Sequence, residues 1–470
     1  MFKQRLLPLA LAALLPTASF AAGGAKNVIF FLGDGMGPVT VTAARILKYK
    51  EEGSLNMDKL SRTARIKTYS LDAQTTDSAP SMAAYMTGVK TRNETLSLDA
   101  VTKAVAPSRD ATTGVGNSVN NCPATGNGAA SATLLELAIA KGKATGVVST
   151  ARLTHATPAA TYAHVCHRNA EYEIARQAAP GGAGYNAALG AGVDVLMGGI
   201  SQYWTPFNAT SNKSGRPDGR DLVAEMKAKG YNFVSDLTTL NAAPAAAGTK
   251  LLGLYDFAVA QGHMSYNLDR DATKEPSLAQ MTVKSLDILS KNANGFFLMV
   301  EGGRIDHALH ETNAARALDE TIAFDDAIKA ALDNVKTFDP TLANTLIVVT
   351  ADHDHTMAFN GYGKRGDSPL GLSNSYVDGA PNKDKNGQPY TTLVFGGGAN
   401  RPDTRGALTA PIVTDINYLQ EVAVRRGSKG SETHGGGDVM LMSTGAGSAG
   451  FKGTLDNTKV FGLVKSAAGY

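Results

Sequence analysis

The sequence predicts an α/β protein in which a central, mostly parallel sheet is sandwiched between helices. Three observations favour this class. Short apolar runs recur along the chain, amphipathic helical patterns lie between them, and residues typical of binding sites follow several of the runs. The chain has 470 residues, 43% of them hydrophobic and 19% charged, which suffices for a large core.

The elements of this sheet follow from the apolar periodicity. The first run, residues 27–32, ends in a Gly-rich turn and predicts a buried strand. Further strands of the sheet are expected at residues 146–149, 194–197, 295–300, 346–350 and 391–395. Helices are expected at residues 130–141, 278–290 and 313–332. Strands that alternate with helices are typical of a parallel sheet.

The N-terminus combines a charged start, an apolar run too short to span a bilayer, and small residues up to Ala21. We expect residues 1–21 to be a signal peptide and the mature protein to be periplasmic or secreted. Residues 22–470 are expected to form a single domain, because no repeat and no clear linker divides them. Irregular composition predicts surface insertions at residues 99–129 and 399–432.

Charge and cysteine content exclude several classes of function. The net charge is +3 without a long basic run, so a nucleic-acid partner is not expected, and no later stretch is apolar enough to span a membrane. The two cysteines, Cys122 and Cys166, are too few for thiolate metal clusters. Export permits a disulfide between them, but two free thiols are an equal alternative. A small-molecule substrate is favoured.

Residues with oxygen or imidazole ligands stand where predicted strands end. In open α/β sheets, ligands bind beyond the carboxyl ends of the strands. Asp34, Thr157 and Glu301 lie at three such ends, and Asp352 and His353 share a fourth. Each residue alone is weak evidence for a metal site, since an Asp in a Gly-rich turn, for example, more often stabilises the turn than binds an ion. Together they suit Zn²⁺ and Mg²⁺.

Four further residues are candidates for the same site: Asp306, His310, His434 and Ser78. Asp306 and His310 would share one helical face, although a solvated face is the ordinary interpretation of such a pair, and His434 lies in a Gly-rich loop where an exposed structural histidine is usual. At a helix start the Ser78 hydroxyl would face an anion, unless Asp77 or Ser78 is merely an N-cap. Metal coordination could lower the pKa of that hydroxyl without a Ser-His-Asp triad. The turn at residues 33–37 is neither a P-loop nor a full dinucleotide fingerprint.

These motifs, in this order, resemble the alkaline phosphatase family from about residue 27 to past His434. The matching segments are NVIFFLGDGMG at 27–37, TDSA at 76–79 with GVK at 88–90, HATPAATYAHVCHR at 155–168, VEGGRIDHALH at 300–310 and TADH at 350–353. The segment at 301–310 and its adjoining helix are most similar to the animal branch. Such a number of motifs excludes chance agreement.

The resemblance implies a hydrolase of phosphate monoesters that forms a phosphoserine on Ser78 and clamps phosphate with Arg168. It also implies a homodimer, with two Zn²⁺ and one Mg²⁺ per chain. The implied ligand sets are Asp306, His310 and His434 for one Zn²⁺, Asp34, Asp352 and His353 for the other, and Asp34, Thr157 and Glu301 for Mg²⁺.

Some positions depart from the family pattern. His155 and His307 stand where another bacterial branch has Asp and Lys, so we expect them, with Asp77, beside the ligands and expect a weaker Mg²⁺ site. Animal members carry a calcium site, for which the partial matches are Tyr255, Asp256 and Glu275, with Thr239 in place of a carboxylate; that ion is left unassigned. The histidines interpreted as structural or surface residues are His164, His167, His263 and His355.

A sulfatase or phosphodiesterase of the same superfamily is the nearest alternative. Sulfatases use Cys/Ser-x-Pro-x-Arg, and Met82 stands here where that Arg would be. A non-enzymatic metal- or phosphate-binding protein would need no nucleophile, and Ser78 argues against it. The natural substrate is left open.

Overall fold

The structure is a computed structural model that describes residues 24–210, 214–426 and 430–470. The expected signal peptide, residues 1–21, lies outside the described residues. The described residues form a 10-stranded sheet. In spatial order its strands are β15 (Gly453–Asp456), β2 (Arg62–Lys67), β14 (Val439–Gly445), β8 (Thr345–Thr350), β1 (Asn27–Gly33), β7 (Phe296–Gly302), β3 (Ala144–Arg152), β4 (Val195–Gly199), β6 (Lys250–Tyr255) and β5 (Tyr231–Val234).

The prediction of a mostly parallel sheet is confirmed. Every neighbouring pair from β8 to β5 is parallel, whereas β14 runs antiparallel to both of its neighbours, β2 and β8. The first strand is buried along its whole length, as its continuous apolar run predicts. In the central strands Leu32 pairs with both Glu301 and Thr350, and Glu301 pairs with Ser149. The carboxyl ends of β8, β1, β7 and β3 therefore lie side by side.

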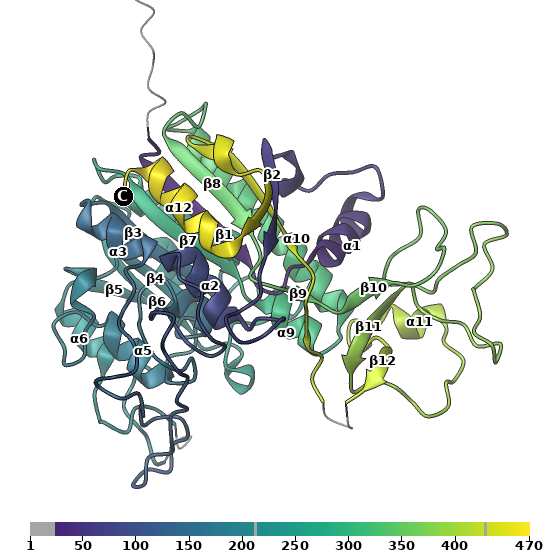
Figure 1. Cartoon of the computed structure of the whole chain (residues 1–470), viewed down its shortest axis with the longest axis horizontal. Helices are drawn as coiled ribbons and strands as arrows, with labels where there is room; N and C mark the ends of the chain where they lie inside the picture. The colour runs from purple at the N-terminus through teal and green to yellow at the C-terminus, as the bar shows by residue number, and fades with distance from the viewer. Residues whose placement is uncertain (1–23, 211–213, 427–429) are drawn as a thin grey trace, which may run out of the picture.

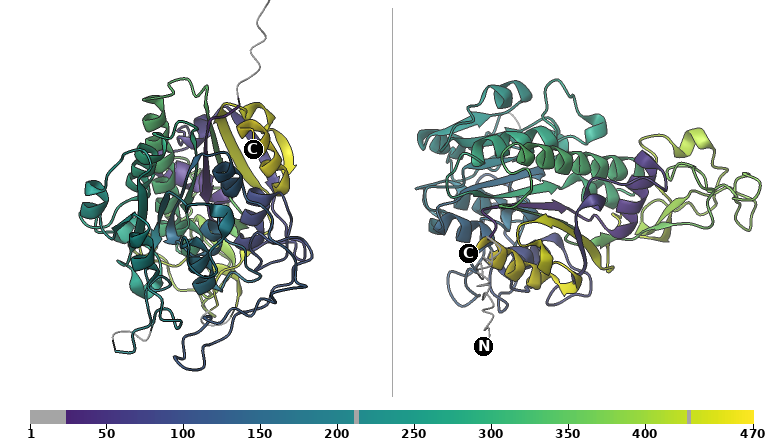
Figure 2. Two further views of the ribbon diagram at one scale, coloured as in Figure 1. Left: turned by 90° about the vertical axis from the view of Figure 1, so that its left-hand side faces the viewer. Right: turned by 90° about the horizontal axis from the view of Figure 1, so that it is seen from above.

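Helices cover both faces of the sheet. The long helix α10 packs with α1, α8 and α9 on one face, and α12 packs with α2 on the other, as the right-hand view of Figure 2 shows. The helices are α1 (Pro38–Tyr49), α2 (Ser78–Thr87), α3 (Leu134–Ala140), α4 (Ala156–Ala159), α5 (Glu171–Ala178), α6 (Leu222–Ala228), α7 (Leu237–Ala242), α8 (Leu278–Leu289), α9 (Arg304–His310), α10 (Ala314–Lys336), α11 (Ala410–Val413) and α12 (Asn457–Ala468). No helix of the described residues is long and apolar enough to cross a membrane.

A small second sheet lies to one side of the main body (Figure 1). It consists of β10 (Met357–Phe359), β11 (Leu393–Gly398) and β12 (Val422–Arg425). The expectation that residues 391–395 join the main sheet is wrong, because β11 pairs antiparallel with β10 and parallel with β12 instead. An apolar run predicts a strand but not the sheet in which it pairs. The small sheet also begins at Met357, well before the insertion expected at 399–432.

Residues 99–129 form turns and isolated bridges rather than helices or long strands. Of the two alternatives for the cysteines, the structure has the disulfide between Cys122 and Cys166, whose Cα atoms lie 5.7 Å apart. This bond ties the irregular segment to the chain two residues before Arg168. A third, two-stranded sheet pairs β9 (Asp354–His355) with β13 (His434–Gly435) and brings two distant parts of the sequence together.

Candidate metal and phosphate site

The predicted ligands meet at the carboxyl ends of the central strands. Asp34 follows β1, Glu301 lies in β7, Asp352 and His353 follow β8, and Thr157 lies in α4 after β3. All five side chains are buried, with an exposed fraction of 0%. The helix α9 and the strand β9 lie beside them, between the main sheet and the small sheet (Figure 1).

Asp306, His310 and His434 converge on one point. The spacing of Asp306 and His310 places them on one helical face, because the segment is helix α9. The Asp306 Oδ1 atom lies 3.4 Å from His310 Nε2 and 3.6 Å from His434 Nε2. His434 reaches this point from β13, and it is a part of the site rather than an exposed loop residue.

The hydrogen bonds of these two histidines leave both Nε2 lone pairs facing inward. His310 Nδ1 donates to the Glu432 carbonyl at 2.7 Å, and His434 Nδ1 donates to the Thr76 carbonyl at 2.8 Å. A carbonyl oxygen only accepts, so each Nδ1 carries the proton and a neutral ring has its lone pair on Nε2. The two Nε2 atoms nevertheless lie 3.1 Å apart. A cation between them and the Asp306 carboxylate would satisfy all three groups, and two imidazoles with one carboxylate fit Zn²⁺.

A second group consists of Asp34, Asp352 and His353. His353 Nδ1 donates to the Asp354 carbonyl at 3.2 Å, so its Nε2 lone pair also faces inward, 3.3 Å from Asp34 Oδ1 and 3.6 Å from Asp352 Oδ2. The Asp352 Oδ2 atom is buried without a hydrogen-bond partner. Two carboxylates and an imidazole with an inward lone pair fit a second Zn²⁺.

The third group brings oxygen ligands together. Thr157 Oγ1 lies 3.3 Å from Asp34 Oδ2, and Ser149 donates a hydrogen bond to Glu301 Oε2. The other Glu301 oxygen, Oε1, is buried and unpartnered. His155 also belongs here, since one potential ligand atom each from Asp34, His155 and Glu301 lies within 4.8 Å of the other two. The oxygen atoms of Asp34, Thr157 and Glu301 fit Mg²⁺. The imidazole of His155 adds a nitrogen atom to this group, and nitrogen suits Mg²⁺ less well.

Burial makes these carboxyl groups unfavourable as anions unless a cation accompanies them. It raises the pKa of Asp34 well above its usual value, with repulsion from Asp306 and Glu301 adding to the effect. Burial likewise raises the pKa of Glu301 and of Asp352 to about 8. Bound cations would offset the desolvation and the mutual repulsion together.

Ser78 lies at the start of a buried helix, as predicted. Its Oγ atom is 3.2 Å from His353 Nε2 and 3.4 Å from Asp34 Oδ1. Asp77 is the N-cap of α2 and accepts from the Ala79 backbone N–H at 2.6 Å. The same Asp77 carboxylate accepts from Arg168 Nη1 at 3.2 Å, so one residue both begins the helix and holds the arginine. The structure thus brings Ser78, Asp77 and Arg168 to one place.

Three histidines, His155, His263 and His307, form a buried cluster beside Arg168. His155 accepts from Arg168 Nη2 at 2.9 Å, and its ring centroid lies 5.4 Å from that of His307. Burial, followed by the charges of Arg168 and Arg152, holds the pKa of His155 well below its usual value. The pKa of His307 is also held well below its usual value, by burial and then by the charge of Arg304. Both rings are therefore neutral neighbours of the third group.

The chain is similar to known proteins along most of its length. A family model described as "Alkaline phosphatase" matches residues 25–470. The human tissue-nonspecific isozyme of alkaline phosphatase is 38% identical over 449 residues, which cover 90% of this chain and 79% of the human one. The chain belongs to the alkaline phosphatase family. The alkaline phosphatase of Gadus morhua is 36% identical over 449 residues, covering 90% of this chain and 87% of its own.

Solved structures share the fold of this alkaline phosphatase family member. The crystal structure of Thermus thermophilus alkaline phosphatase has a TM-score of 0.66 at 25% identity and covers 97% of this chain and 96% of its own. A mutant of the TAB5 alkaline phosphatase, with Mg bound in its M3 site, has a TM-score of 0.63 at 23% identity and covers 95% and 99%.

Two residues of the site were missed by sequence reasoning. His355 is not a surface residue, since it is buried and its Nε2 donates to Asp306 Oδ1 at 2.7 Å while its Nδ1 donates to the Glu432 carboxylate. Burial alone would lower the pKa of His355, but these two hydrogen bonds raise it to about 10. His355 therefore orients the Asp306 carboxylate as a cation. Its position two residues after the predicted ligand His353 was an available signal.

His263 was also missed. It lies against the cluster, with its ring centroid 3.9 Å from that of His307, and it accepts from the Arg152 backbone N–H at 3.1 Å. No local pattern in the sequence indicates this contact. By contrast, His164 is a structural residue as expected, since it bonds to the Ser97 carbonyl and to Glu136.

The partial match to a calcium site brings no new cluster. Asp256 accepts from Ser201, and Glu275 accepts from the Ser265 backbone at 2.8 Å. Thr239 bonds within the start of its own helix, α7. Within the described residues, no group of potential ligands includes Asp256 or Glu275.

Proposed function

We propose that this protein hydrolyses phosphate monoesters through a phosphoserine intermediate on Ser78, with two Zn²⁺ and one Mg²⁺ bound at the three groups described above. The observation that carries the proposal is the Ser78 hydroxyl. It is buried at the start of α2, within 3.4 Å of both Asp34 and His353, among side chains that could hold metal ions. The family of the chain supports the same reaction class.

The ligand sets follow the convergence of the side chains. Asp306, His310 and His434 would hold one Zn²⁺, Asp34, Asp352 and His353 the other, and Asp34, Thr157 and Glu301 the Mg²⁺. When bound, these ions supply Lewis-acid stabilisation of negative charge and favour the ionised form of a nearby hydroxyl.

The residues of the chain then perform a two-step displacement. Ser78 Oγ attacks phosphorus, a bond forms between them, and the bond to the leaving alcohol oxygen breaks. Water next attacks the phosphoserine, which releases inorganic phosphate and restores the Ser78 hydroxyl. The Arg168 fork stabilises the non-bridging oxygens in both steps. Asp77 and His155 hold Arg168 in the orientation that this requires.

Export and assembly belong to the same proposal. We propose a periplasmic or secreted homodimer built from residues 22–470 as one domain. The disulfide between Cys122 and Cys166 supports an oxidising compartment.

Acid-quenched trapping tests the serine. After brief incubation with labelled phosphate monoester, the label should be recovered on Ser78, and Ser78→Ala should lose most of kcat while retaining its metals. Ser81→Ala is the matched control, because Ser81 lies one turn further along α2 and donates to the Asp352 carbonyl; it should still be labelled. Label on another residue would refute the assignment. Sulfate ester and phosphodiester substrates in the same assay distinguish the neighbouring enzyme classes.

A further inference from the structure

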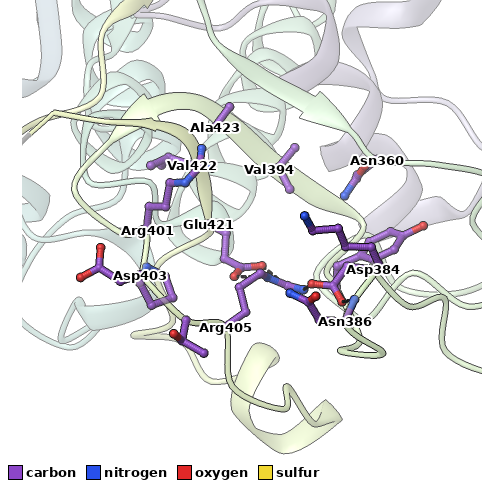
Figure 3. A pocket seen from close by; sticks show the side chains of 14 residues that line it. Asn360, Asp384, Asn386, Val394, Arg401, Asp403, Arg405, Glu421, Val422 and Ala423 are labelled. Atoms are coloured by element: carbon purple, nitrogen blue, oxygen red, sulfur yellow. Dashed lines mark hydrogen bonds and ion pairs between the residues drawn. The ribbon is translucent and has the colours of Figure 1, made fainter.

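Two cavities of the described residues could receive a ligand beyond the reacting phosphate. The larger, about 860 Å³, lies against the small sheet (Figure 3). Its central Arg405 pairs with Asp384 and with Glu421, each at 2.7 Å, so its charges are already compensated. The other cavity, about 630 Å³, borders the proposed metal centre. Its walls include Gln261, His263, Arg304, His307, His310 and Leu419.

Arg304 in the second cavity has no negatively charged partner. Its side chain is only 2% exposed. It donates to His307 Nδ1 at 3.1 Å and to Gln261 Oε1, and its guanidinium carbon lies 3.6 Å from the centre of the Tyr266 ring. All three partners are neutral, and the Nε atom is buried without a hydrogen-bond partner. Among the described residues, Arg304 forms no ion pair with a carboxylate.

Glu320 interacts electrostatically with Arg304 without a hydrogen bond to it, and it is a weak counter-charge. Glu320 is itself buried and accepts from the Asn267 backbone at 2.6 Å. Burial raises its pKa to about 7, so it is only partly ionised near neutral pH. A buried guanidinium that lacks a full counter-ion costs free energy. A ligand with a carboxylate or phosphate group would offset that cost, because the guanidinium fork matches both groups.

The cavity reaches the proposed centre at His310, which belongs to the group of ligands that Ser78 does not contact. Ser78 contacts Asp34 and His353, whereas His310 lines the cavity and approaches Asp306 from helix α9. In an in-line displacement, the leaving group departs opposite the attacking hydroxyl. The alcohol part of a monoester bound to Ser78 would therefore extend toward His310 and the cavity.

We propose that this cavity is a subsite for the alcohol part of the substrate, and that Arg304 binds a second anionic group on it. The inference rests on the proposed phosphatase activity. The preferred substrates are then phosphate monoesters whose alcohol carries a carboxylate or a further phosphate group.

A pair of matched substrates tests the subsite. 4-Carboxyphenyl phosphate and 4-carbamoylphenyl phosphate have nearly the same size and differ in charge. The carbamoyl group withdraws electrons more strongly, so leaving-group chemistry alone favours the neutral substrate. The wild-type protein should nevertheless show a kcat/KM at least about fivefold higher for the carboxylate. Arg304→Gln should abolish this preference and Arg304→Lys should retain part of it, while Arg220→Gln, remote from the cavity and paired with Glu225, should leave it unchanged.

A second pair of variants covers the case in which replacing Arg304 disturbs α9. Leu419 is 41% exposed in the wall of the cavity, so polar residues are tolerated there. Leu419→Glu should lower the preference for the carboxylate at least about threefold relative to Leu419→Gln. Equal kcat/KM values of the wild-type protein for both substrates would overturn the subsite and leave the phosphatase proposal intact. Absence of turnover of any monoester, p-nitrophenyl phosphate included, would overturn both.

Discussion

Replacing Arg168 with Ala removes the fork that holds the phosphate oxygens. The side chain is positioned by Asp77 at 3.2 Å and His155 at 2.9 Å, which leaves its remaining N–H groups for the substrate. Two charge-assisted hydrogen bonds to phosphate contribute about 1.5–3 kcal/mol each, or about 3–6 kcal/mol together. The expected result is a fall in kcat/KM of roughly 10²- to 10⁴-fold, with weaker inhibition by inorganic phosphate.

The fold should survive this change, because Asp77 keeps its hydrogen bonds from the backbone N–H groups of Ala79 and Glu94. Arg168→Lys is the matched comparison: it keeps the charge without the fork and should lose less. Arg176→Ala, which removes an arginine paired with Glu173 on α5, should retain full activity. Steady-state turnover of p-nitrophenyl phosphate and its inhibition by phosphate provide the measurements. A loss below about tenfold, together with unchanged phosphate inhibition, would refute the role of Arg168.

Three further predictions concern metal affinity, pH and the disulfide. His155→Asp should bind Mg²⁺ about 10- to 100-fold more tightly than the wild type and resist excess Zn²⁺ better, because a carboxylate replaces neutral imidazole beside Asp34 and Glu301. The measurement is a Mg²⁺ titration of each protein with only its two zinc ions bound. Activation of the wild type and the variant at equal Mg²⁺ concentrations would contradict this. Burial raises the pKa of Glu320 in the folded state to about 7, above its usual 4.5. The folded state therefore binds an extra proton, and its stability falls as pH rises through that interval. In urea unfolding, Glu320→Gln should be about 1–3 kcal/mol more stable than the wild type at pH 8 but little different at pH 4, and an equal difference at both pH values would rule this out. Replacing Cys122 and Cys166 with Ser should lower the free energy of unfolding by about 2–4 kcal/mol, and an unchanged value would show that the bond adds no stability.

Much of the fold and most of the site residues could be predicted locally. Asp34, Glu301 and Asp352 each belong to a motif at the end of an apolar run, and a parallel sheet brings the ends of such runs to one edge. The helical spacing of Asp306 and His310 needed no tertiary information either. The strands at the edges were harder to predict: β2 and β15 are partly exposed and lack a continuous apolar run.

The contacts that the sequence did not predict join residues far apart in the chain. His355 and Glu432 are 77 positions apart and meet because β9 pairs with β13. His263 reaches His307 from a different segment, and neither residue carries a local motif that indicates the other. A hydrogen bond between distant side chains depends on how the intervening chain closes, which composition and periodicity do not encode.

The sequence by itself determined the class of the sheet, the chemistry of the strand ends and the resemblance to a family, because each depends on residue type and short-range spacing. The tertiary structure decided which way the histidine rings face, whether Cys122 and Cys166 are bonded, and that residues 393–398 form part of a separate sheet. It also decided that Arg304 is buried beside the proposed metal centre without a carboxylate partner among the described residues. The physical reason is the same in each case: ring orientation, disulfide distance and burial of charge are set by atoms that distant segments contribute.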